Sequence, residues 1–149
     1  MAAQEKLRSL AAEVIEELCE RGAPFSFRSA GSSMLLTILP GSTLEVTPTR
    51  DVEVGDIALV RGPRGVVAHR VIATTDGDVE LQGDGQARPH VVPWDDVLGR
   101  ITRVTWHGLP LPATSAWAPG FSRAMRRIAP TVRRLTTLAI AARRMLRGS

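Results

Sequence analysis

The sequence predicts a mainly β fold with flanking helices: a compact, curved antiparallel sheet or partial barrel, an N-terminal helix and a basic helical C-terminal tail. Three observations support this prediction. Short β-like runs with Gly and Pro turns fill residues 25–105, an amphipathic pattern precedes them, and arginine-rich helical patterns follow them. The 149 residues suffice for one domain with a substantial core.

Residues 1–24 form the expected N-terminal amphipathic helix. Apolar side chains recur at steps of three and four residues, and glutamates occupy much of the opposite side. Gly22 is typical of a helix C-cap, and Pro24 prevents the helix from continuing. We expect the helix to pack on the body of the protein; binding of a partner is the alternative. The recurring apolar positions are Leu7, Leu10, Val14, Ile15 and Leu18.

Residues 25–107 form the predicted β domain. Its strands are short, and turns rich in Gly, Pro and Asp separate them. The turn at residues 62–65 joins two strands into a hairpin, and residues 83–89 form a loop. The expected strands are 25–27, 34–39, 42–46, 56–61, 66–73, 79–82 and 97–104.

The C-terminal region divides into a linker and a basic tail. Residues 108–120 are rich in Pro and small residues, and residues 121–149 show two helical patterns that Pro130 separates. Residues 117–149 hold eight arginines and no acid, whereas residues 1–116 hold eleven basic and fifteen acidic residues. A basic amphipathic helix suits an anionic membrane surface or a docking partner. A solvated helix is the alternative, and the lack of interleaved aromatic residues argues against nucleic acid.

Composition limits the other classes of function. The single cysteine, Cys19, excludes an internal disulfide and a cysteine-rich zinc site. Three scattered histidines make no metal site, so we expect neither metal nor cofactor; His90 and His107 are interpreted as surface or packing residues. With no apolar run of about 18 residues and no secretory signal, we expect a cytoplasmic protein, with the tail placing it peripherally at the inner face of the membrane.

Three residues could form a proton-relay nucleophile: Ser33, His69 and Asp84. Serine attacks poorly unless a base removes its proton, and neutral imidazole suits that role near neutral pH. A carboxylate on the far ring nitrogen would fix the tautomer. Each residue also has a plain structural interpretation: a turn hydroxyl, a polar residue on a strand face and a turn-forming acid.

Four ordered motifs resemble the serine peptidase superfamily of type I signal peptidases and self-cleaving SOS repressors, over about residues 27–104. The first motif surrounds the family's nucleophile and matches Ser33, which stands directly before Met34, rather than Ser32. The others are a strand start, a His-Arg-Val segment, and a Gly-Asp pair followed by a late strand. They read Gly31-Ser-Ser-Met-Leu-Leu-Thr-Ile38, Val54-Gly-Asp-Ile57, His69-Arg-Val-Ile72, and Gly83-Asp84 with Val97-Leu-Gly-Arg-Ile101.

The resemblance implies a compact signal-peptidase-type β domain and a serine endopeptidase that cleaves a peptide or protein precursor. Ser33 would be the nucleophile and Asp84 the orienting carboxylate. Many members carry a lysine base at the position of His69, whereas the endoplasmic-reticulum and archaeal-like branch carries histidine. The only lysine of this chain, Lys6, lies far upstream, so the resemblance implies His69 as the base.

Two departures from the family pattern favour an alternative function. Leu36 stands where the family usually has proline, and the stretch after Gly83-Asp84 contains no second acid before Asp95. The alternative is a non-catalytic module that binds a peptide or partner on the same fold. For the endopeptidase, the expected ligand is an extended peptide that lies along a strand edge. The sequence does not specify the oligomeric state.

Overall fold

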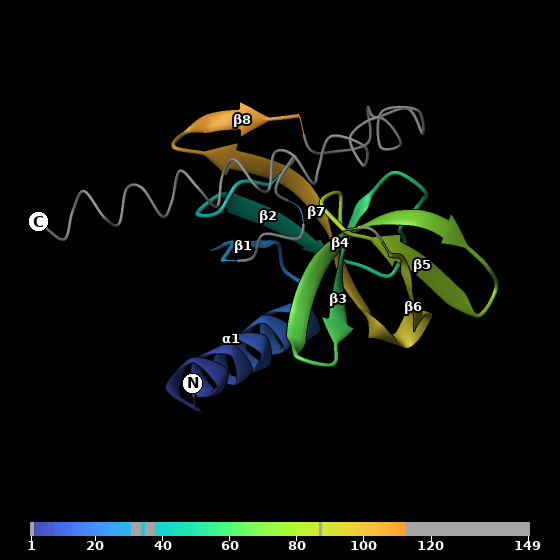
Figure 1. The fold of residues 1–149 in the computed structure, drawn as a ribbon, viewed down its shortest axis with the longest axis horizontal. Coiled ribbons are helices and arrows are strands. Elements are labelled where there is room, and N and C mark those ends of the chain that lie inside the picture. Colours follow the sequence, from blue (N-terminus) through green and yellow to red (C-terminus); the bar gives the residue numbers. More distant parts are fainter. Residues whose placement is uncertain (1, 31–33, 35–37, 87, 113–149) are drawn as a thin grey trace, which may run out of the picture.

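The structure is a computed structural model, and it describes residues 2–30, 34, 38–86 and 88–112. Ser33 and the tail at residues 121–149 lie outside the described residues. One helix precedes a series of strands, with a short 3-10 helix before the longest late strand (Figure 1). In chain order the elements are α1 (Ala2–Glu20), β1 (Phe25–Arg28), β2 (Thr43–Pro48), β3 (Ile57–Gly62), β4 (Gly65–Thr74), β5 (Asp78–Gln82), β6 (His90–Pro93), η1 (Trp94–Asp96), β7 (Val97–Trp106) and β8 (Leu109–Leu111).

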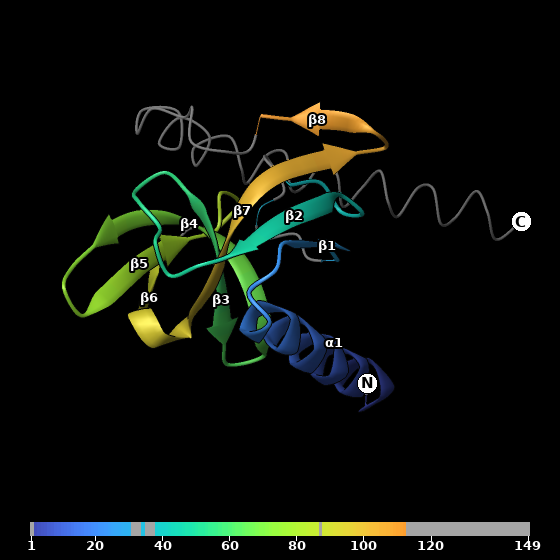
Figure 2. The same ribbon diagram turned by 180° about the vertical axis from the view of Figure 1, so that it is seen from behind.

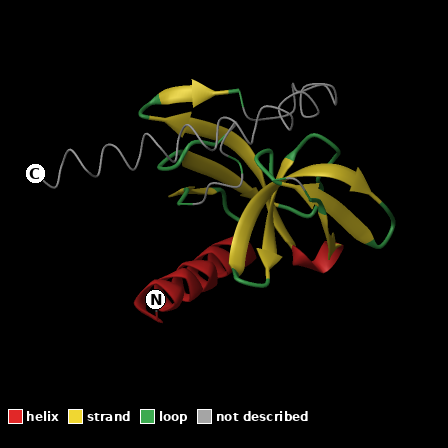
Figure 3. Cartoon of the chain, in the orientation of Figure 1, coloured by secondary structure: helices red, strands yellow, loops and turns green. Residues whose placement is uncertain are grey.

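The strands form one antiparallel sheet in the order β1-β2-β7-β3-β4-β5-β6, and β8 pairs with β7. The sheet curls into a half-barrel, and strands dominate the described chain (Figure 3). Register shifts interrupt the β2–β7, β3–β7 and β4–β5 ladders. Such bulges bend a strand and increase its twist, which suits a curled sheet. The mainly β, curved antiparallel prediction is therefore confirmed.

Strand β3 has a separate apolar core on each of its faces. Successive side chains of a strand point to opposite faces, so Ile57 and Leu59 enter one core while Ala58 and Val60 enter the other. All four residues are buried. The first core also holds Met34, Ile38, Leu44, Val46, Ile101 and Val104, and the second holds Val52, Val71, Val79, Leu81, Val92 and Val97.

Helix α1 lies beside the end of the β3–β4 hairpin, as Figures 1 and 2 both show. Ile15 and Cys19 pack against the first core. The predicted packing of the helix on the body is correct for this part only. Leu7, Leu10 and Val14 are exposed, so the apolar positions of the helix are not all buried. The sheet contacts the side of the helix that carries Ala12, Ile15 and Cys19.

Three local expectations need correction. In the expected strand at residues 34–39, Met34 lies in a turn, and the Ile38 N–H donates to the Met34 carbonyl at 2.6 Å, which closes a turn instead of a ladder. Strand β6 follows the predicted loop but was not expected. Strand β8 occupies the start of the predicted linker. Among the described residues it pairs with β7 only, and an edge strand tolerates Pro110 because its outer side forms no ladder hydrogen bonds that would need a backbone N–H.

Gly99 allows β2 and β7 to approach each other closely. A Cβ atom at this position would lie 2.8 Å from Val46 Cγ1 and 3.0 Å from the Thr47 carbonyl oxygen. Contacts this short require a shift of neighbouring atoms, and the Thr47 oxygen belongs to the backbone of the paired strand. Only glycine therefore fits here without a change in the β2–β7 pairing.

We expect Gly99→Ala to lower the free energy of unfolding by about 1–3 kcal/mol, because the added methyl group overpacks the β2–β7 contact. Gly77→Ala is the matched control, since nothing lies within 4 Å of a Cβ at Gly77 and its φ is not in the left-handed region. Urea unfolding of the two variants measures the difference. Equal stability of both variants would contradict the close-approach argument.

Candidate functional site

The predicted site residues fall on different parts of the fold. His69 lies in β4 opposite Ala58 of β3 and is 5% exposed. Asp84 lies in the loop after β5 and is also buried. Ser33 is outside the described residues, but its neighbour Met34 is buried in the first core. The described part of the site is therefore built from β4, the β5–β6 loop and Met34.

Asp84 forms a buried ion pair with Arg70, the residue after His69. Arg70 Nε donates to Asp84 Oδ1 at 2.9 Å, and Arg70 Nη2 donates to Oδ2 at 2.8 Å. The side chains are 3% and 7% exposed. Both carboxylate oxygens thus hold the planar guanidinium fork, which is the strongest geometry for such a pair. Orientation of His69 by Asp84 stays a prediction, since Asp84 has this structural task as well.

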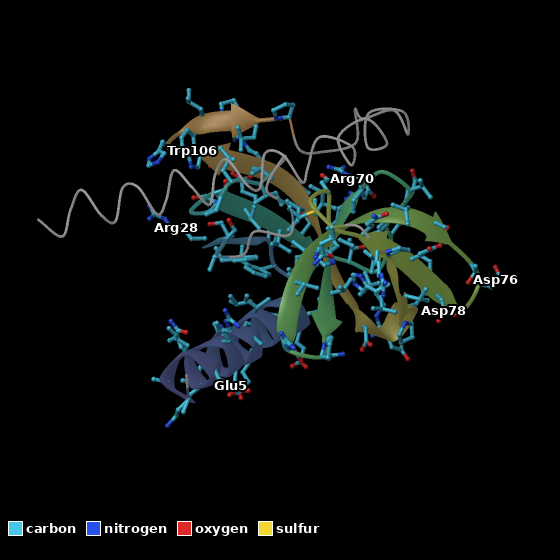
Figure 4. The ribbon with its side chains drawn as sticks, viewed as in Figure 1. Glu5, Arg28, Arg70, Asp76, Asp78 and Trp106 are labelled. Atoms are coloured by element: carbon cyan, nitrogen blue, oxygen red, sulfur yellow. The ribbon has the colours of Figure 1, made fainter. Side chains whose placement is uncertain are left out.

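Two further contacts extend the ion pair to distant parts of the chain. Arg70 Nη1 donates to the Gly55 carbonyl oxygen at 2.7 Å. The Asp84 backbone N–H donates to Met34 Sδ at 3.1 Å. The segment before β3, strand β4, the β5–β6 loop and the neighbour of Ser33 are thereby fixed to one another. Figure 4 shows Arg70 between the two halves of the sheet, far from Asp76 and Asp78 at the tip of the β4–β5 hairpin.

The environment of His69 favours the neutral imidazole. Burial, together with the nearby His90, lowers the pKa of His69 from 6.5 to about 4, although Asp84 opposes both effects. At neutral pH the ring is therefore uncharged and can accept a proton. This protonation state is the one that a general base requires.

The structure brings His69 together with His90, which the sequence analysis interpreted as a surface or packing residue. The ring centroids are 4.9 Å apart, and the ring planes meet at 73°. Strand register explains the contact: Val71 of β4 lies opposite Leu81 of β5, which lies opposite His90 of β6. His69 is two residues before Val71 and shares its face of the sheet. The alternation of β4 was visible in the sequence, but strand β6 was not.

An apolar cavity of about 130 Å³ lies beside Ala68, the residue before His69. Ala30 and Met34 also line it. The volume suits a small apolar side chain. The lining residues are Phe27, Ser29, Ala30, Met34, Ile38, Leu44, Leu59, Val66, Val67 and Ala68.

The first half of β4 has a ladder on one side only, within the part of the chain that the structure describes. Strand β3 pairs with β4 from Gly65 to Arg70, whereas β5 pairs with β4 only from Arg70 to Thr74. Helix α1 lies against Gly65, so residues 66–69 present the edge that can accept an added strand. This edge runs directly to His69 and borders the cavity.

Comparisons with known proteins add no functional assignment: no protein-family model matches the sequence, and no curated protein matches it either.

Residues 2–30, 34, 38–86 and 88–112 contain no group of three or more His, Cys, Asp or Glu side chains that could hold a metal ion. No helix among the same residues has the length and apolar character needed to cross a membrane. The geometry around His69 is therefore the basis for a functional proposal.

We expect Asp84→Ala to lower the free energy of unfolding by about 3–5 kcal/mol, because it leaves the Arg70 charge buried without its partner. Glu45→Ala is the matched control, since Glu45 and Arg103 form an exposed pair, and its loss should cost less than about 1 kcal/mol. Chemical denaturation compares the two variants. A cost for Asp84→Ala no larger than the control would show that the ion pair is not a structural constraint.

We also expect acid to destabilise the protein through His69. Its pKa is about 4 when folded and about 6.5 when unfolded, so below pH 6.5 the unfolded chain binds a proton that the folded chain does not. This contribution is absent above pH 6.5 and reaches at most about 3 kcal/mol near pH 4. His69→Gln should flatten the decline of unfolding free energy between pH 7 and pH 4.5. An unchanged pH dependence in that variant would contradict the assignment.

Proposed function

We propose that this protein is a serine endopeptidase with Ser33 as the nucleophile and His69 as the general base. One observation carries the proposal: a buried, neutral imidazole follows directly on Val66, Val67 and Ala68, three residues of a strand edge that line an apolar cavity. The four sequence motifs support it independently, because they assign the base and the nucleophile to these same two residues.

The proposed substrate is an extended segment of a peptide or protein precursor. It would add as a strand to residues 66–69 of β4, so that main-chain hydrogen bonds hold it and alternate side chains face the body of the protein. One small apolar side chain would enter the cavity of about 130 Å³. The scissile bond would then lie near the end of the edge, where His69 stands.

The chemistry follows from these roles. As Ser33 Oγ bonds to the peptide carbonyl carbon, its proton passes to His69, and the carbonyl oxygen becomes an oxyanion. The Ser33 backbone N–H is the proposed donor to that oxyanion. His69 returns the proton to the leaving nitrogen as the peptide bond breaks, and water then releases the acyl group by the reverse sequence.

The proposed location is the cytoplasm, with the tail at residues 121–149 contacting the inner face of the membrane. Its support is the sequence: as a helix, the tail would place most of its arginines opposite an apolar arc, and a surface of anionic lipid attracts such a segment.

A non-catalytic peptide-binding module is the second candidate. The observation that favours it is the engagement of both Asp84 oxygens by Arg70, because a triad carboxylate would have to orient His69. The same edge and cavity would then bind a peptide without cleaving it. This candidate predicts that His69→Ala leaves peptide affinity unchanged and that no acyl-enzyme forms.

We expect a fluorophosphonate probe to label the protein at one serine, because an activated hydroxyl attacks the phosphorus atom. Ser33→Ala should abolish the mass increase seen by intact-protein mass spectrometry, and His69→Ala should slow labelling by about 10²–10⁴-fold. Ser32→Ala is the matched control and should be labelled at nearly the wild-type rate. Labelling of Ser33→Ala at the wild-type rate, or no labelling of the wild type, would reject the endopeptidase proposal.

A further inference from the structure

We infer that His90 is a positioning residue for the general base His69. The two imidazoles would act as a pair in which His90 fixes the tautomer and orientation of the base. The inference rests on the proposed function for its catalytic consequence. Its structural part, the dependence of the His69 tautomer on His90, stands without it.

Geometry is the first support. The ring centroids lie 4.9 Å apart at an interplanar angle of 73°. The hydrogen bond that we infer between the rings forms on rotation about χ2, which is a broad torsion in histidine. The backbone holds both residues in place, because His69 belongs to the β3–β4 ladder and His90 to the β5–β6 ladder.

The engagement of Asp84 is the second support. Its oxygens accept hydrogen bonds from Arg70 Nε and Nη2, and the guanidinium balances its charge. Asp84 still favours a charged His69 electrostatically, but His90 is in ring contact with the base. The acid thus acts on His69 through its charge, and the second histidine is in ring contact with His69.

The chemistry of imidazole is the third support. A neutral ring has one N–H donor and one nitrogen acceptor, so His90 can accept a hydrogen bond from the N–H of His69, and the other nitrogen of His69 can then take the serine proton. Burial lowers the pKa of His90, which keeps its acceptor nitrogen available at neutral pH. In each step the proton moves between Ser33, His69 and the leaving nitrogen, and His90 neither gains nor loses one.

The plain alternative is edge-to-face packing of two rings without a functional consequence. Phenylalanine can preserve such packing but has no ring nitrogen, whereas asparagine and aspartate offer an acceptor oxygen at a similar distance from the backbone. His90→Phe, His90→Asn and His90→Asp therefore separate packing from hydrogen bonding. Thermal unfolding of each variant verifies that it is folded; if one of the acceptor variants does not fold, the other serves in its place.

The first measurement is fluorophosphonate labelling of the full chain, resolved into a maximal rate and a half-saturating concentration. We expect His90→Phe to lower the maximal rate by about 10-fold or more with the half-saturating concentration unchanged, since the base loses orientation while the binding surface stays intact. His90→Asp or His90→Asn should keep a rate within about threefold of the wild type. A wild-type rate for His90→Phe would overturn the inference.

The second measurement is ¹⁵N NMR of the His69 ring nitrogens, which reports the tautomer without any reaction. We expect one tautomer in the wild type and a mixture, or the other tautomer, in His90→Phe. An inert wild type whose His69 tautomer changes in His90→Phe would reject the endopeptidase and retain the histidine pair. A reactive wild type with the same tautomer and rate in His90→Phe would retain the endopeptidase and reject the pair.

Discussion

The buried ion pair between Arg70 and Asp84 is the constraint on which the rest of this structure depends. Charged groups that lose their water destabilise a fold unless each finds a partner with good geometry, and the bidentate contact supplies it. Through Gly55 and Met34 the same pair joins segments that are remote in sequence. The relative positions of β4, the β5–β6 loop and the chain next to Ser33 follow from it.

Adjacent residues of β4 have different tasks because a strand turns successive side chains to opposite faces. Arg70 faces the ion pair, whereas His69 shares its face with Val71 and the second core. Burial there makes the imidazole a neutral group. The structural charge and the proposed base are thus one residue apart in β4 and have different partners.

Curling of the sheet creates both the cores and the proposed binding surface. Among the residues that the structure describes, the first half of β4 pairs with β3 only, since β5 begins to pair at Arg70. That edge borders the apolar cavity. A flat, fully paired sheet would have neither this strand edge nor this cavity. Both features that suggest peptide binding therefore result from the curvature of the sheet and the lengths of its strands.

The sequence by itself determined the mainly β class, the α1 helix, most strands and their turns, because side-chain periodicity and Gly or Pro turns are local signals. It also selected His69 and Asp84, since each stands in a distinctive local motif. Only the tertiary structure decided that Asp84 pairs with Arg70 and that His90 contacts His69. These contacts depend on the register of β5 and β6 and on the curl of the sheet, which are set by long-range packing and leave no periodic trace in the sequence.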